Sequence, residues 1–397
     1  MRSLHTLIGI AVLLTNSVSS YAGEWSGNVD FEARLFTQSP ADSRQHGNNL
    51  SLSAEPEYYT QWDNGDQAFT FKPFVRLDQG DDERSHADIR ELSWILVGDT
   101  WELRAGIRKE YWGVTESQHL VDIINQTDLV ENADGEDKLG QPMLNFAWIT
   151  DNGTFDFFIL PYFRERTFAG IEGRLRTQPY VNTDNPVYES ANEEKHIDYA
   201  ARWSHSIDAF DIGLSHFYGT SRDPRLVAGI DTNGQATLIP HYDLINQTGL
   251  DLQATLDNWL LKLEAIHRHG NNLDYNASTS GFEYTFYGVF NSAADIGLLA
   301  EYLYDDRGAL ATTPFEDDVL VGTRLTLNDE QSTAILFGVI QDLDDDSYAL
   351  NLEASRRLTD HWTLSVEGRS YHNIAAGDPL IAFARDDYLQ INFVYYY

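Results

Sequence analysis

Few segments of this chain combine side chains that could perform covalent chemistry. Gly213, Ser215 and His216 could supply a nucleophile and a base, but the second glycine of a nucleophile elbow is missing and the segment alternates like a strand. His267 and His269 share one face near the end of another alternating segment, which favours an interfacial role over a metal site. We therefore expect no enzyme, no catalytic residue, no cofactor and no metal site.

A run of aspartates is the other candidate for chemistry. Asp342, Asp344, Asp345 and Asp346 could hold Ca²⁺ or bridge through divalent cations to lipopolysaccharide. Their spacing lacks the ordered ligand pattern of a dedicated calcium loop, so a solvated acidic turn is the favoured interpretation.

Charged side chains also recur at every second position of long alternating segments. In 259–269, Trp259, Leu261 and Leu263 alternate with Lys262 and Glu264, and this period of two predicts a β-strand with one apolar and one polar face. Because unpaired charges in a dry core are costly, charges on strand after strand indicate a water-filled interior. The charged residues predicted to line it are Lys72, Arg76, Glu102, Arg104, Arg108, Glu110, Arg164, Arg202, Lys262, Glu264, Arg268, Glu353, Arg357, Glu367 and Arg369.

The basic residues in the first half of this set should share one wall, with Glu102 and Glu110 between them. Opposite acidic groups, such a wall would create a transverse field that orients polar solutes and selects ions. The alternative interpretation is that these charges are paired and purely structural. The wall would consist of Lys72, Arg76, Arg104, Arg108, Arg164 and Arg202.

Eighteen alternating segments account for most of the chain. Connections such as 63–66 and 257–258 are short and have hairpin-turn residues, whereas most of those between them are longer. An even strand count with short turns on one side and long loops on the other is typical of a transmembrane antiparallel β-barrel. We therefore predict an all-β barrel of 18 strands, and 16 also fits if one hairpin is misassigned. The segments are 24–36, 48–62, 67–78, 86–98, 100–111, 141–151, 153–165, 196–207, 209–219, 241–257, 259–269, 273–288, 294–305, 317–328, 331–342, 346–358, 361–372 and 387–397.

Two prolines lie inside these predicted strands. Pro73 and Pro161 lack the backbone donor that a strand ladder requires. We expect a bulge or a local bend at each.

The final segment predicts how the barrel closes. One face carries an apolar row made of Leu389, Ile391, Phe393, Tyr395 and Tyr397. Gln390 and Asn392 lie on the other face. A terminal apolar strand is an aggregation hazard unless it closes a sheet against lipid. We expect it to pair with the first segment, 24–36, and the barrel prediction fails without that pairing.

The beginning of the chain predicts export. Residues 1–22 combine Arg2, an apolar stretch over 7–14 and small residues before Ala22, as in a secretory signal peptide. The remaining residues, 23–397, should form a single barrel domain. With no cysteine, there is neither a lipoprotein acylation site nor a disulfide framework.

Composition agrees with a barrel. Mean hydropathy is −0.39, and no apolar run approaches the ~18 residues of a membrane-spanning helix. The formal net charge of −35 argues against nucleic acid as a partner.

The connection 112–140 is the most individual part of the chain. Leu120, Val121 and Ile124 lie at near-helical spacing with Leu129, which predicts a short amphipathic helix. Because a long loop with its own apolar face must pack on something, we expect it to fold into the barrel and narrow the pore; an external flap is the alternative. The constriction residues would be Trp112, His119, Asp122, Asn125 and Asp128.

Part of this region resembles a known family. The segments 106–108, 112–113 and 122–125, with Asp128, are similar to a strand-and-loop pattern in porin-like proteobacterial outer-membrane proteins. These include uncharacterised barrels often encoded near lipid or hydrophobe exporters and, more loosely, alginate-export-type 18-stranded barrels. The terminal aromatics Phe393, Tyr395 and Tyr397 resemble the signal that the barrel-assembly machinery reads in outer-membrane barrels.

These patterns together predict a porin-like outer-membrane channel for passive diffusion of small or moderately sized polar solutes. Both termini would be periplasmic, and the outer surface would contact lipid and lipopolysaccharide as a monomer or a homo-oligomer. A barrel for export or uptake of hydrophobic molecules or polymer is one alternative. A hydrolase with its site at the barrel rim, or a secreted soluble binding protein, are others.

Overall fold

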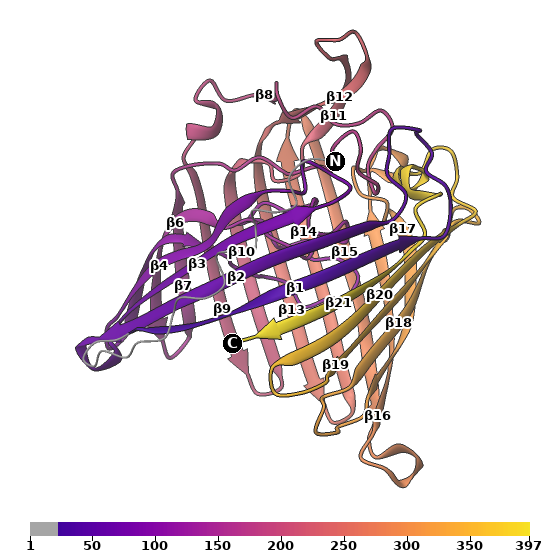
Figure 1. The fold of residues 1–397 in the computed structure, drawn as a ribbon. Helices are drawn as coiled ribbons and strands as arrows, with labels where there is room; N and C mark the ends of the chain where they lie inside the picture. Colours follow the sequence, from indigo (N-terminus) through magenta and orange to yellow (C-terminus); the bar gives the residue numbers. More distant parts are fainter. Residues whose placement is uncertain (1–22) are drawn as a thin grey trace.

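The computed structural model describes residues 23–397, so the predicted signal segment 1–22 lies outside the described residues. Eighteen strands form one closed antiparallel sheet that makes a barrel (Figure 1). The predicted count of 18 is confirmed, and 16 is wrong. Among residues 23–397, no helix is long and apolar enough to cross a membrane.

The barrel strands follow the predicted segments closely. The largest difference is at β7, which ends at Leu160, and β5 ends at Arg108, where the chain turns into the barrel. The barrel strands are β1 (Glu24–Phe36), β2 (Asn49–Trp62), β3 (Gln67–Asp78), β4 (Ala87–Val97), β5 (Trp101–Arg108), β6 (Gln141–Thr150), β7 (Gly153–Leu160), β9 (Asp198–Ile207), β10 (Phe210–Thr220), β13 (Leu244–Leu256), β14 (Trp259–Gly270), β15 (Leu273–Phe286), β16 (Asp295–Asp305), β17 (Asp317–Thr326), β18 (Ala334–Asp342), β19 (Tyr348–Arg357), β20 (Trp362–His372) and β21 (Tyr388–Tyr396).

The last strand closes the barrel as predicted. β21 pairs antiparallel with β1, with Phe393 opposite Phe31 and Ile391 opposite Ala33. On the inner face, the guanidinium Nε of Arg34 donates to the side-chain oxygen of Gln390 at 2.7 Å. Closure leaves no strand edge exposed, which is the condition for a sheet to lie in lipid.

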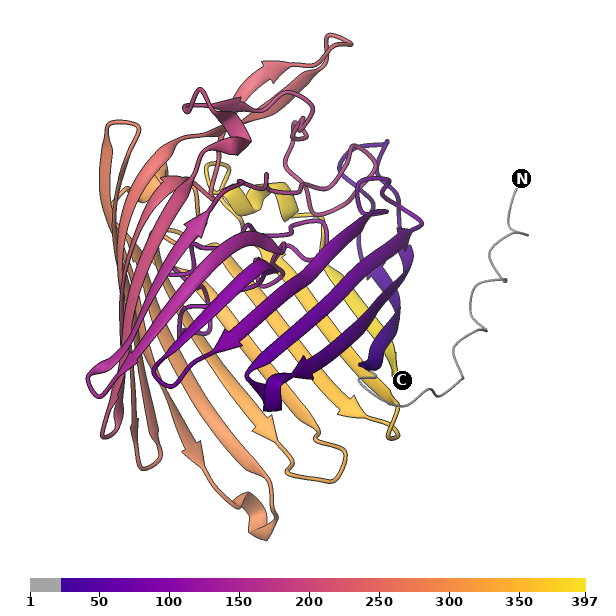
Figure 2. The same ribbon diagram turned by 90° about the vertical axis from the view of Figure 1, so that its left-hand side faces the viewer.

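Connections alternate in length around the barrel. At one end the strands are joined by short turns such as 98–100, 151–152 and 257–258, and both Glu24 and Tyr396 also lie there. At the other end most connections are longer, with the two-residue turn 271–272 as an exception, and Figure 2 shows part of them inside the outline of the barrel. These are called the short-turn end and the long-loop end below.

The outer face of the barrel is apolar and rich in tryptophan. Phe31 and Leu50 are 49 % and 59 % exposed, and comparable apolar residues follow on strand after strand. Of the nine tryptophans, all but Trp112 sit on outward positions near the short-turn end. Such a girdle marks a membrane–water interface, so this is the architecture of a transmembrane barrel. The girdle consists of Trp25, Trp62, Trp94, Trp101, Trp148, Trp203, Trp259 and Trp362.

The two prolines behave differently. At Pro73 the register of β3 against β4 shifts, which confirms the expected bulge. At Pro161 the chain shows the other expected outcome, a local bend at Tyr162, but it follows the end of β7 at Leu160 and does not lie inside the strand. Lacking a donor, proline ends the strand there instead of interrupting it.

A second, three-stranded sheet was not predicted. It comprises β8 (Val187–Tyr188), β11 (Arg225–Ile230) and β12 (Ala236–Tyr242) and lies beyond the long-loop end, at the top of Figure 1. The turn residues at 231–234 and the alternation on either side could have revealed its hairpin. The described part of the chain also contains five short 3-10 helices: η1 (Asp63–Gly65), η2 (Glu193–Lys195), η3 (Val289–Asn291), η4 (Gly308–Leu310) and η5 (Pro379–Phe383).

One glycine is required by the close approach of two strands. Gly106 in β5 has a φ of +131°, and a Cβ there would lie 2.0 Å from the carbonyl oxygen of Leu92 in β4. We expect G106A to destabilise the barrel by roughly 2 kcal/mol or more, since both the backbone conformation and the contact oppose it. Urea unfolding measures this. The matched control is G368A in β20, where the nearest atom would be an ordinary 3.6 Å away; equal effects would contradict the expectation.

Candidate functional site

Residues 112–140, called the lumen segment below, cross the interior of the barrel. Their contacts reach Arg76 of β3, Glu264 of β14, Glu301 of β16 and Arg369 of β20, which are spread around the ring. Figure 2 shows this part of the chain within the ring of strands. The geometry fits the inward position and not an external flap.

Two carboxylates of the barrel wall bind the start of the lumen segment. Glu264 accepts hydrogen bonds from the backbone N–H of Val114 and Thr115, at 2.7 and 3.0 Å, and from the Thr115 hydroxyl at 2.7 Å. It also accepts from the N–H of Val121 at 3.2 Å. Because Glu264 is fully buried, its predicted role as a water-facing lumen residue is wrong: the lumen segment covers it.

Glu301 binds the next residues in the same way. Its carboxylate accepts from the backbone N–H of Glu116 and Ser117, at 2.7 and 2.8 Å, and from the Ser117 hydroxyl at 2.6 Å. Glu301 was not among the predicted site residues. Its inward parity on β16 identified the face, but nothing in the sequence paired it with Ser117.

His119 strengthens this anchor. Its Nε2 lies 3.2 Å from Glu136 and its Nδ1 lies 3.7 Å from Glu264. These two carboxylates, Glu136 foremost, accept from the charged imidazolium and raise the pKa of His119 to about 10. The imidazolium is therefore charged at neutral pH and joins the segment to the wall.

This pKa shift predicts a pH dependence. A histidine whose folded pKa lies above its usual value of about 6.5 stabilises the folded arrangement fully below that value and less as the pH rises toward the folded pKa. We expect the lumen segment to loosen between pH 7 and 10 as the anchor at His119 is lost, so that current through the barrel in planar bilayers becomes larger and noisier. Current recordings across this range test it. H119Q should be insensitive to pH there, and an unchanged response in H119Q would contradict the assignment.

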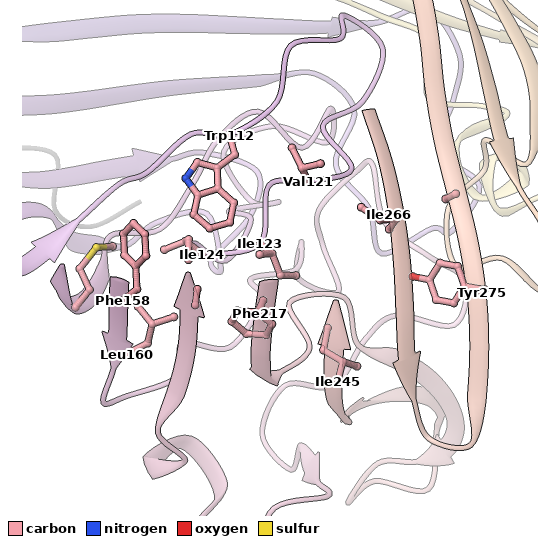
Figure 3. Close-up of a cluster of buried hydrophobic side chains, with 13 residues drawn as sticks. Trp112, Val121, Ile123, Ile124, Phe158, Leu160, Phe217, Ile245, Ile266 and Tyr275 are labelled. Atoms are coloured by element: carbon pink, nitrogen blue, oxygen red, sulfur yellow. The ribbon is translucent and has the colours of Figure 1, made fainter. Parts of the chain in front are cut away.

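Apolar side chains fix the middle of the lumen segment. Val121, Ile123 and Ile124 are at most 2 % exposed and pack on inward residues of β7, β10, β13 and β14 (Figure 3). The Trp112 ring meets the Phe158 ring edge-on, with centroids 5.7 Å apart. This cluster makes the segment part of the protein core.

The helix expected over 120–129 is wrong, because the segment is irregular there. Side chains, and not the backbone of a helix, form hydrogen bonds with the backbone groups of this part of the chain. Asn125 accepts from the Glu110 N–H at 2.8 Å and donates to the carbonyls of Arg108 and Leu139, each at 2.8 Å. Arg222 donates to the Ile124 carbonyl at 3.0 and 3.1 Å.

The acidic part of the segment forms ion pairs with the wall. Asp128, fully buried, lies 2.5 Å from Arg90. Glu131 lies 2.7 Å from Arg76, and Asp134 lies 3.4 Å from Arg369. Within the segment, Asp122 lies 3.3 Å from Lys138. The structure thus places all five predicted constriction residues inside the barrel. Their side chains contact either the barrel wall or other residues of the lumen segment.

The six predicted basic residues lie on or next to β3, β5, β7 and β9, within one run of consecutive strands from β3 to β9. Each pairs with a carboxylate, so together they are a row of ion pairs and not an open cationic wall. Apart from Arg104 with Glu102, the pairs are Lys72–Glu57 at 2.8 Å, Arg76–Glu131 at 2.7 Å, Arg108–Glu110 at 2.9 Å, Arg164–Asp88 at 3.0 Å and Arg202–Asp251 at 2.7 Å.

The remaining predicted lumen residues are distributed more widely. Lys262 lies 3.5 Å from Glu116 of the lumen segment, and Arg268 donates to Gln247 at 2.8 Å. Arg369 lies between Glu353 and Glu367, at 2.8 and 3.7 Å. Arg357 is an exception. It is exposed at the short-turn rim, where it donates to the Glu330 carbonyl and the Ser332 hydroxyl.

A second segment, 166–177, covers the long-loop end and was not predicted to do so. Arg174 donates to Asp386 at 2.6 Å, and Asp81 accepts from the Gly170 N–H at 2.9 Å. Gln45 donates to the Gly173 carbonyl at 3.0 Å. The repeated arginines in 166–177 were the feature of the sequence that could have indicated ion pairs with other loops.

The two histidines considered for chemistry lie beside side chains of the next strand, β15. His267 and His269 face outward, and their Nδ1 atoms lie 3.1 Å from Asn276 and 2.5 Å from Asp274. In the lumen, His86, Asp128 and Glu131 place potential ligand atoms within 4.8 Å of one another. Arg90 and Arg76 already pair with these two carboxylates, so the arginines balance the negative charge that a metal ion would otherwise balance.

Comparisons with known proteins give only distant similarity. No protein-family model matches the chain, and no curated protein matches it. A mutant of the porin of Rh. blastica is 14 % identical with a TM-score of 0.45, over 94 % of this chain and 100 % of that chain. A loop-deletion mutant of OmpT, an outer membrane protein of Vibrio cholerae, is 10 % identical with a TM-score of 0.46, over 95 % and 100 % of the two chains.

Proposed function

We propose that this protein is an outer-membrane channel for passive diffusion of small or moderately sized polar solutes, narrowed by the lumen segment. The observation that carries the proposal is a closed barrel whose interior bears ion-paired charges and is crossed by an anchored segment. A barrel of this strand number encloses an aqueous channel unless it is filled. A segment fixed to opposite walls would set the width of that channel.

The same proposal places the protein in the membrane. The short-turn end, with both chain ends and the tryptophan girdle, would be periplasmic, and the long-loop end would face lipopolysaccharide. Phe393 and Tyr395 of β21, with Tyr397, would be read by the assembly machinery before closure. The apolar exterior would serve a monomer and a homo-oligomer alike.

Planar-bilayer recording of the purified protein tests the channel. We expect discrete conductance steps, and liposome swelling that falls as the size of a neutral sugar increases. Absence of both steps and swelling would contradict the proposal and favour a barrel that moves apolar molecules past a filled lumen.

A further inference from the structure

A separate cavity lies at the long-loop end, beyond the anchors of the lumen segment. It has a volume of about 340 Å³ and is lined by residues from five different connections between strands. Leu129 of the lumen segment, Phe168, Leu175, Leu226 and Phe383 supply apolar walls. A mostly apolar cavity of this size with a few polar groups is typical of a small-molecule site.

Two residues of the cavity lining each carry a buried polar atom that lacks a partner. Within residues 23–397, neither Nε of Arg176 nor the hydroxyl of Thr177 has a hydrogen-bond partner, although both atoms are buried. The other guanidinium nitrogens of Arg176 are occupied: they donate to the carbonyls of Thr177 and Ile171, at 2.9 and 3.1 Å, and to Asp42 at 3.1 Å. Arg176 itself is only 5 % exposed. An unpaired buried donor is costly, so a ligand that accepts from it gains affinity.

The acidic side chain of the lining is already engaged. Asp223 accepts from Arg166 at 2.9 Å and from the Thr312 hydroxyl at 2.6 Å. The residues of the lining therefore carry unpaired donors but no unpaired carboxylate. This asymmetry favours a ligand whose polar end is an acceptor, above all a carboxylate, because hydrogen bonds between charged groups are the stronger ones.

We propose that this cavity binds a small carboxylate with an apolar body, such as an arylalkanoate. The carboxylate would accept from Arg176 and Thr177, and the apolar body would pack on Phe168 and Leu226. The inference rests on the proposed channel function, since Leu129 joins the cavity wall to the lumen segment. The channel would thus collect such a solute at its long-loop end before it passes.

Calorimetric titration of the protein in nanodiscs, free of detergent, tests the site. Phenylbutyrate, phenylbutanol and phenylbutylamine share one apolar body and differ in their polar ends. We expect saturable binding of phenylbutyrate and at least tenfold weaker binding of the other two. Equal affinities for the three compounds, or no saturable binding, would overturn the proposal.

Two substitutions on one strand locate the site. Leu226 lines the cavity, whereas its neighbour Val227 does not, since successive strand residues face opposite sides. We expect L226W to weaken phenylbutyrate binding at least tenfold and V227W to leave it unchanged. T177V, which keeps the shape of the side chain and removes the hydroxyl, should weaken binding severalfold. Similar effects of L226W and V227W would contradict binding in this cavity.

The binding and channel proposals fail separately. Conductance steps without saturable phenylbutyrate binding would overturn the cavity site and leave the channel. Binding that L226W abolishes, in a protein without conductance, would support the site and overturn the channel.

Discussion

Replacing both Glu264 and Glu301 with glutamine should raise the single-channel conductance severalfold and make the current fluctuate. The two carboxylates accept seven hydrogen bonds from residues 114–121. Hydrogen bonds to a charged group contribute about 1.5–3 kcal/mol each. A glutamine offers one acceptor oxygen in place of two. A loss of about 3 kcal/mol at a site would change the ratio of anchored to released segment by roughly a hundredfold for each of the two sites.

The control for this double variant is E102Q. Glu102 also faces the lumen and is also a carboxylate, but it pairs with Arg104 and does not contact the lumen segment. E102Q removes one unit of negative charge where the double variant removes two, so twice its effect on the current is the part that charge alone explains. If E264Q/E301Q changes the current by no more than this part in planar bilayers, the lumen segment does not set the conductance.

The strand pattern of this protein could be predicted because each strand carries its own signal. Leu261 and Leu263 face lipid while Lys262 and Glu264 face inward, and this local alternation needs no knowledge of the partner strand. Turn residues such as Asp257 and Asn258 then fix where each hairpin reverses. In a closed antiparallel barrel, order along the chain largely determines order around the ring, so few topological choices remain.

The contacts between the lumen segment and the barrel wall could not be predicted from the sequence as the strands could. Parity correctly turned Glu264 inward, but its partners lie about 150 residues away in the chain, in Val114 and Thr115. The near-helical spacing of Val121 and Ile124 arose from burial against several strands and not from helix formation. Tertiary contacts therefore override local periodicity wherever a connection enters the barrel.

Ending the chain at Asp387 should abolish the folded barrel. This truncation removes β21, which pairs with β1 on one side and with β20 on the other. Both neighbours would then present unpaired backbone groups to lipid, each of which costs several kcal/mol. We expect no heat-modifiable band in gel electrophoresis and no protease-resistant form in the membrane fraction.

A deletion elsewhere separates loss of closure from loss of any β-hairpin. Residues 226–240 belong to the hairpin of β11 and β12, which lies outside the barrel sheet. Arg225 and His241 are paired neighbours, so a short glycine-serine linker can join them without strain. This variant removes more residues than the truncation, yet every barrel strand keeps both partners. It should still show the heat-modifiable band, whereas loss of the band in both variants would mean that the barrel depends on more than ring closure.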